Sequence, residues 1–133
     1  PGPGKRPRSS ISPAIVLDGS NRPVVALGSP GGATIITTVL QTLTEFLDRH
    51  LPLVDAIAAP RASQRNAAQT ELEPALYNSP LRQQLEAIGH HFTLNPEIGA
   101  ATGVQRLPNG EWLAAAEKVR RGGGSAMVVD PAP

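Results

Sequence analysis

The sequence has no cysteine and few aromatic residues, and these two absences narrow the chemistry that it can carry. Its 133 residues include one tryptophan, one tyrosine and two phenylalanines. Without cysteine, disulfides, thiolate zinc sites and a cysteine nucleophile are all excluded, while the redox compartment stays open. No apolar run approaches the roughly 20 residues that span a bilayer.

The sequence also lacks a strong charge of either sign. Its formal net charge is +1, and its basic residues gather only near the two ends, at 5–8 and 118–121. No aromatic residues interleave with them, so we interpret both groups as solvated rims and expect no nucleic-acid partner. Adjacent His90 and His91 lack the spacing of helical metal ligands, and we expect no metal and no cofactor. The length suits one domain with a modest core, and we treat residues 1–133 as such.

The hydrophobic pattern predicts two strands, then helices, then further strands. Strands at 14–17 and 23–29 flank a turn at 18–21, and the second run does not alternate, as expected of a strand covered on both faces. Apolar spacings of three and four predict a helix from Thr34 to near His50, followed by helices over 53–59 and 79–88. We expect strands at 72–76, 91–94, 103–107, 111–116 and 126–129, and a loop over 61–70. Hairpins dominate, which favours an α+β fold around an antiparallel sheet with helices.

The most informative segment is Gly28-Ser29-Pro30-Gly31-Gly32, which ends an apolar run and opens a helical pattern. Such a turn aims consecutive backbone N–H groups at one point, so Gly31 and Gly32 are candidates for an oxyanion hole. Glycine also lets a substrate approach where a Cβ would stand. A tight strand-to-helix turn without a ligand explains the same residues. A phosphate loop is disfavoured, because no Gly-Lys-Ser/Thr follows.

Two other segments have more than one interpretation. Ser9 and Ser10 follow a basic stretch and could be nucleophiles, ligands of a substrate carboxylate or simple loop residues. No Gly-x-Ser-x-Gly elbow supports a nucleophile, whereas neutral hydroxyls beside cations suit a carboxylate. Residues 122–125 (Gly-Gly-Gly-Ser) could cradle an anion or lead flexibly into the last strand.

Three segments in sequence together resemble the γ-glutamyltransferase family, whose members cleave glutathione. Residues 1–13 resemble the family's PGPGKRPLSSMSP segment, and residues 28–41 resemble its GSPGG-xx-I-x-TTVLQ segment. Residues 55–61 are similar to its E/D-A-xx-APR stretch. The resemblance continues to the Gly-rich end and so covers essentially the whole chain.

The resemblance implies an N-terminal-nucleophile hydrolase with an αββα sandwich, of which this chain would be the C-terminal part of the small subunit. In that family a precursor cuts itself into a large and a small subunit, and the new N-terminal threonine attacks the γ-glutamyl carbonyl. The γ-glutamyl-enzyme then passes its acyl group to water, an amino acid or a peptide. By motif match, Gly31 and Gly32 would form the oxyanion hole, and Ser9 and Ser10 would bind the donor's α-carboxylate. The resemblance also suggests a secreted, periplasmic or cell-envelope location.

The sequence lacks parts that complete members of the family contain. It starts downstream of the threonine nucleophile and lacks the large subunit, so we expect coding sequence upstream and no hydrolase activity from these residues alone. Ala33-Thr34 stands where common members carry Ser-Arg, and the residues after Arg61 differ from the common Phe-His-His. Exposed apolar area left by the missing parts predicts that the chain pairs with itself.

Two alternatives to a γ-glutamyltransferase stay open. One is an acylase of the same fold that removes a glutaryl-type side chain from a β-lactam, because the same turn would serve another acyl group. The other is a non-catalytic fragment or interaction domain that keeps the fold but forms no product.

Overall fold

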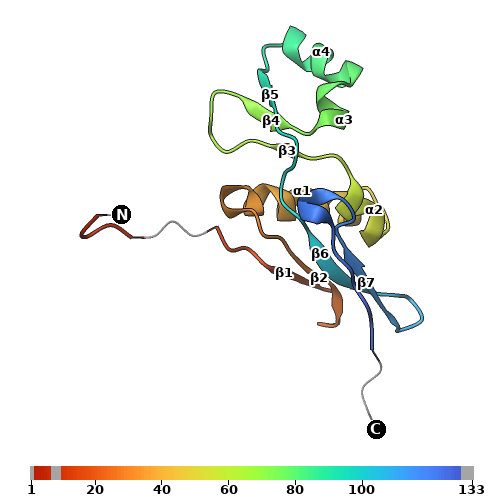
Figure 1. Ribbon diagram of the computed structural model, residues 1–133. Helices are drawn as coiled ribbons and strands as arrows, with labels where there is room; N and C mark the ends of the chain where they lie inside the picture. Colours follow the sequence, from red (N-terminus) through yellow and green to blue (C-terminus); the bar gives the residue numbers. More distant parts are fainter. Residues whose placement is uncertain (1, 7–9, 130–133) are drawn as a thin grey trace.

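The computed structural model describes residues 2–6 and 10–129, and its elements form two sheets with separate helices. Figure 1 shows the larger sheet with α1 and α2 beside it, and the smaller sheet with α3 and α4 at the far end of the molecule. The elements are β1 (Ala14–Leu17), β2 (Pro23–Gly28), η1 (Gly32–Thr34), α1 (Ile35–Leu47), α2 (Leu53–Ala58), β3 (Ala62–Ser63), β4 (Thr70–Leu72), α3 (Pro74–Tyr77), α4 (Pro80–Ala87), β5 (Phe92–Leu94), β6 (Thr102–Arg106), β7 (Trp112–Ala116) and η2 (Arg120–Gly122).

The main sheet is antiparallel throughout, in the order β1-β2-β6-β7. Val25 and Leu27 of β2 point to the face that α1 and α2 cover, where they pack with Val39, Leu53 and Ile57. This pairing of helices with an antiparallel sheet confirms the predicted α+β class. The hydrophobic core therefore lies between one face of the sheet and two helices.

The opposite face of the main sheet is open, contrary to the prediction that β2 is covered on both faces. Ile15, Ala26 and Val104 are directly opposite one another across three strands, and they share this open face. Ile15 is 69 % exposed and Trp112 is 40 % exposed. A shallow hollow runs over this face, and the segment Ser125–Met127 lines one side of it.

The small sheet, β3-β4-β5, differs most from the expectation. β4 and β5 are parallel, because α3 and α4 carry the chain back to the start of the sheet. The predicted loop over 61–70 contains β3, and the predicted strand over 72–76 is the end of β4 followed by α3. Pro74 explains that change, because it occupies the first position of α3, where a proline fits a helix.

Local turn signals located most of the remaining elements correctly. The turn before β2 is held by the Asp18 side chain, which accepts N–H groups from Ser20 and Arg22. Gly110 adopts φ 90 in the hairpin between β6 and β7. Residues 126–129 do not form the predicted strand. Among the described residues, none of the helices has the length and apolar character needed to cross a membrane.

Candidate functional site

Four segments meet at one end of the main sheet, and they include the residues that the sequence singled out. Antiparallel pairing sets Ala14 opposite Leu27, so the residues before β1 and those after β2 leave the sheet at the same end. Gly28 in turn is opposite Thr102, and Thr102 is opposite Ala116. The start of β6 and the end of β7 therefore lie at this end too.

The turn after β2 requires glycine at two positions for different reasons. Gly31 adopts φ 145, and a Cβ built on it would lie 2.5 Å from Oγ1 of Thr34. Gly32 adopts φ 57, a left-handed conformation, but a Cβ there would have nothing within 4 Å. Both conformation and close packing thus require glycine at position 31, whereas conformation alone requires it at position 32.

The N–H groups of Gly31 and Gly32 have no acceptor among the described residues. In the part of the chain that the structure describes, neither donates a hydrogen bond to another residue. The carbonyl oxygen of Gly31, in contrast, accepts two bonds, from the N–H of Thr34 at 3.2 Å and from its Oγ1 at 3.0 Å. Among the described residues, the Gly31 carbonyl is therefore bonded within the chain, whereas the N–H groups of Gly31 and Gly32 have no acceptor.

Of the paired serines, only Ser10 lies within the described residues, and Ser9 lies outside them. Ser10 is half-buried, and its carbonyl oxygen accepts a hydrogen bond from Oγ of Ser12 at 3.1 Å. It precedes β1 by a few residues and so lies at the same end of the sheet as Gly31.

A segment between β5 and β6 supports the turn from behind. The N–H of Ala100 donates to Oγ of Ser29 at 3.0 Å, and Oγ of Ser29 donates to the carbonyl of Pro30 at 2.6 Å. Gly99, at φ 67, packs so closely that a Cβ on it would lie 2.9 Å from that same Ser29 oxygen. The turn therefore rests against residues 99–100.

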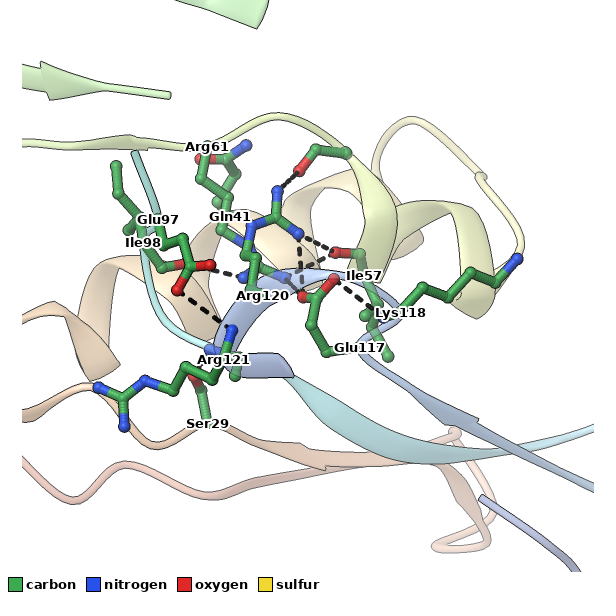
Figure 2. A network of polar contacts seen from close by, with 12 residues as sticks. Ser29, Gln41, Ile57, Arg61, Glu97, Ile98, Glu117, Lys118, Arg120 and Arg121 are labelled. Carbon is green, nitrogen blue, oxygen red and sulfur yellow. Dashed lines mark hydrogen bonds and ion pairs between the residues drawn. The ribbon is translucent and has the colours of Figure 1, made fainter. Parts of the chain in front are cut away.

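Four charged residues from distant parts of the sequence form a buried cluster beside that segment. Figure 2 shows Arg61 and Arg120 both reaching the same carboxylate oxygen of Glu117 and the carbonyl of Ile57. Arg120 bonds Glu73 through two nitrogens, at 2.6 and 2.5 Å. We call Arg61, Glu73, Glu117 and Arg120 the charge cluster, and all four are buried.

The charge cluster also holds the backbone of Ile98, which directly precedes the residues that pack against the turn. Oε1 of Glu73 accepts the N–H of Ile98 at 2.9 Å, and Nη1 of Arg61 donates to the Ile98 carbonyl at 2.8 Å. Arg61 donates as well to the carbonyl of Ile57 at 2.6 Å. Both polar groups of the Ile98 backbone are thus fixed by charged side chains, one residue before Gly99.

Burial and pairing act in opposite directions on these groups. Burial alone would raise the pKa of Glu73, but hydrogen bonds from Arg120 and from the N–H groups of Ile98 and Arg61 bring that pKa below its ordinary value. Burial would lower the pKa of Arg120, and its bonds to Glu73 raise it instead. For Arg61, burial and the neighbouring positive charge of Arg120 prevail, and its pKa is lowered. Glu73 is therefore ionised at neutral pH, with Arg120 as its main partner.

The sequence did not predict the charge cluster. Arg120 was placed with Lys118 and Arg121 in a solvated rim, but it is 8 % exposed, while its two neighbours are exposed. Pro60-Arg61 was noted only for its resemblance to a family stretch. Nothing in the local sequence pattern predicts a pairing between residues as far apart in the sequence as Arg61 and Glu117.

The remaining candidates have simpler surroundings. The N–H groups of Gly123 and Gly124 donate to the carbonyls of Arg120 and Glu117, so residues 122–124 wrap tightly around the preceding turn. Within 2–6 and 10–129, no group of three or more potential ligands could hold a metal ion. His50, His90 and His91 are exposed.

The arrangement can stabilise negative charge without a charged side chain at the point of binding. Two free N–H donors on a rigid turn would hold an oxyanion, and the hydroxyl of Ser10 lies at the same end of the sheet. Among the described residues, no hydroxyl at this end is paired with a histidine base. The described part of the site therefore offers hydrogen-bond donors but no hydroxyl paired with a base.

Comparison with known proteins finds similar sequences along almost the whole chain. The sequence profile of the family described as Gamma-glutamyltranspeptidase matches residues 1–127. The chain is 34% identical over 122 residues to the glutathione hydrolase proenzyme of Bacillus subtilis strain 168, covering 90% of this chain and 20% of that protein. It is 32% identical over 115 residues to the acylase ACY 1 proenzyme of Pseudomonas sp. strain SE83, covering 86% of this chain and 20% of that protein. The chain thus spans about a fifth of the curated relatives that it matches.

A solved structure shows the same fold. The γ-glutamyltranspeptidase of Pseudomonas nitroreducens complexed with L-DON superposes with a TM-score of 0.80 at 31% sequence identity, over 97% of this chain and 67% of that chain. The shared architecture bears out the predicted N-terminal-nucleophile hydrolase class. With a family profile that matches almost from end to end, the chain belongs to the gamma-glutamyltranspeptidase family.

Proposed function

We propose that this chain is the C-terminal part of the small subunit of an enzyme that transfers or hydrolyses γ-glutamyl groups. Its donors would be glutathione or other γ-glutamyl compounds, and its acceptors water, an amino acid or a peptide. The observation that carries the proposal is the pair of N–H groups on Gly31 and Gly32, which have no acceptor among the described residues and lie at the sheet end where Ser10 also lies.

Each part of the site has a separate role in this proposal. The N–H groups of Gly31 and Gly32 stabilise the oxyanion of the tetrahedral intermediate, and Ser9 and Ser10 hold the donor's α-carboxylate. The nucleophile is an N-terminal threonine on a preceding segment outside these 133 residues. Its Oγ attacks the γ-carbonyl, the amine or thiol-bearing peptide leaves with a proton, and the acyl-enzyme then passes its γ-glutamyl group to the acceptor.

A second candidate is a glutaryl-type β-lactam acylase. The 32% identity to acylase ACY 1 favours keeping it, because an oxyanion turn serves any acyl group. The two candidates differ in whether the donor carries an α-carboxylate and α-amino group next to the scissile acyl chain. A non-catalytic fragment is the remaining alternative.

The test is to express the complete open reading frame that contains this chain and to assay a γ-glutamyl anilide and a glutaryl β-lactam side by side. Turnover of the γ-glutamyl donor supports the proposal, and turnover of the glutaryl donor alone supports the acylase. Turnover of neither, or a reading frame that begins near Pro1, supports the non-catalytic alternative. The 133 residues alone should give no turnover above the level of a mock purification.

The open face of the main sheet is the expected contact for the large subunit and the upstream part of the small subunit. Its exposed side chains are apolar: Ile15, Leu17, Val104 and Trp112. Taken alone, the chain should therefore self-associate through this face, and sedimentation velocity should show a concentration-dependent species. A monomer at every concentration would contradict that expectation.

A further inference from the structure

Thr34 makes two hydrogen bonds to one carbonyl, and that carbonyl belongs to the peptide between the two candidate oxyanion glycines. The N–H of Thr34 lies 3.2 Å from the Gly31 oxygen, and its Oγ1 lies 3.0 Å from the same atom. The Thr34 side chain is half-buried and packs directly behind Gly31.

The orientation of that peptide decides whether Gly32 can serve as a donor. In a planar trans peptide the C=O of one residue and the N–H of the next point in opposite directions. When the Gly31 carbonyl is held toward Thr34, the Gly32 N–H must point away from α1 and into the open end of the site. A reversed peptide would present an oxygen to the oxyanion and would repel it.

The covalent chain does not choose between these two orientations. The dihedral angles that flank the peptide are ψ 1 at Gly31 and φ 57 at Gly32. Rotating the peptide by about half a turn changes both angles to values that glycine adopts readily, because it has no Cβ. With glycine on both sides, the preference must come from the hydrogen bonds that the Gly31 oxygen accepts.

We infer that Thr34 is a positioning residue for the oxyanion hole: its hydroxyl holds the Gly31–Gly32 peptide in the orientation that aims the Gly32 N–H at the substrate. This inference rests on the proposed function and adds a residue to it. Thr34 touches no reacting atom, so its effect is exerted through the peptide. The backbone N–H of Thr34 supplies one of the two bonds in any variant, and the hydroxyl supplies the other.

The test uses three variants of the complete protein. Thr34→Val keeps the shape of the side chain and removes the hydroxyl, and Thr34→Ser keeps the hydroxyl. Thr44→Val is the matched control, because Oγ1 of Thr44 also bonds a backbone carbonyl, that of Leu40 at 3.0 Å, on the exposed side of α1, the helix that follows Thr34.

Losing one such bond should lower kcat for a γ-glutamyl anilide by roughly two- to twelvefold. KM should stay within about twofold, because the charge on the oxygen develops only in the transition state. A boronate analogue of the donor, which forms a tetrahedral adduct, should bind more weakly by the same factor, while free glutamate should compete as before. Thr34→Ser should restore both kcat and boronate binding, and Thr44→Val should behave as wild type.

Three results would overturn the inference: unchanged kcat and boronate binding in Thr34→Val, an equal loss in Thr34→Ser, or an equal weakening of boronate and glutamate. A crystal structure of Thr34→Val gives an independent readout. A reversed or doubly occupied Gly31–Gly32 peptide supports the inference, and an unchanged peptide with wild-type activity opposes it. If the wild-type enzyme turns over no γ-glutamyl donor, the proposed function fails, and the peptide orientation in that crystal alone decides the role of Thr34.

Discussion

The Gly31–Gly32 turn and the charge cluster lie near one another but treat their polar groups in opposite ways. In the charge cluster the two carboxylates and two guanidinium groups bond to each other and to the backbone carbonyls of Ile57, Ala59 and Ile98. Of the buried side-chain nitrogens and oxygens of the charge cluster, only Nε of Arg61 has no partner among the described residues. In the turn, two adjacent N–H groups donate to no other residue that the structure describes. Polar groups satisfied inside the protein hold its structure, and groups left open on a rigid turn are ready for a ligand.

The two regions are connected through three consecutive residues. The charge cluster fixes both backbone groups of Ile98, Gly99 packs against the turn, and Ala100 bonds Ser29. Buried ion pairs are weak evidence for net stability, because desolvation offsets their attraction. Their use here is to fix the position of a backbone segment, and through it the turn. The comparison therefore predicts that damage to the charge cluster reaches the turn, whereas damage to the turn leaves the charge cluster intact.

The largest effect is expected from breaking the charge cluster. Glu73→Gln leaves Arg120 buried without its main partner and should lower the free energy of unfolding of the complete protein by about 3 to 5 kcal/mol. Glu86→Gln is the matched control, because its pair with Arg82 is a solvent-exposed pair within one helix, worth at most about 1 kcal/mol. Chemical denaturation measures both. An equal effect of the two substitutions would show that the buried cluster has no special weight.

The next largest effect concerns the two glycines of the turn. Gly31→Ala brings a Cβ to 2.5 Å from Oγ1 of Thr34 and also strains the backbone at φ 145, so the turn must shift. Misplacing an oxyanion donor typically costs about 10²–10³ in kcat. Gly32→Ala meets open space and should lose less, with the left-handed φ 57 costing roughly 1–2 kcal/mol. Steady-state kinetics and unfolding of both variants test this, and a greater loss of kcat in Gly32→Ala would show that the substrate itself fills the space beside Gly32.

The same contrast explains what the sequence could predict. The turn, the first hairpin, α1 and the β6–β7 hairpin were predicted because apolar period and turn residues encode them locally, as with Gly110 at φ 90. The charge cluster was missed because its members are distant in sequence, and each alone resembles a solvated side chain. β3 was missed for a related reason: it has two residues and exists only through its pairing with β4. The open face of the sheet was missed because a run such as Val24–Leu27 shows that a strand is apolar but not what covers it.

A smaller effect is expected at the paired serines, whose proposed contact is with the ground-state substrate. Ser9→Ala and Ser10→Ala each remove a hydroxyl bonded to a carboxylate, a contact worth about 1.5–3 kcal/mol. KM for the donor should rise roughly 10- to 100-fold, with a smaller loss of kcat from misplacement. Ser20→Ala, in the turn at the other end of β1, should leave the kinetics unchanged. If both variants keep the wild-type KM, the carboxylate role is wrong even where the glycine result holds.

The smallest expected effect is the pH dependence of folding stability that Glu73 of the charge cluster contributes. Because hydrogen bonds from Arg120 and two N–H groups outweigh burial, the pKa of Glu73 in the folded state lies below its ordinary value of 4.5. The unfolded chain then binds a proton at a higher pH than the folded protein does, so stability rises with pH across this interval. The contribution of Glu73 is fully present above pH 4.5 and is lost as the pH falls through the folded pKa. In Glu73→Gln this acid-sensitive part is absent, so its stability should approach that of the wild type as the pH falls below 4.5. A Glu73→Gln curve that stays parallel to the wild type in acid would show that Glu73 is not the carboxylate held below its ordinary pKa.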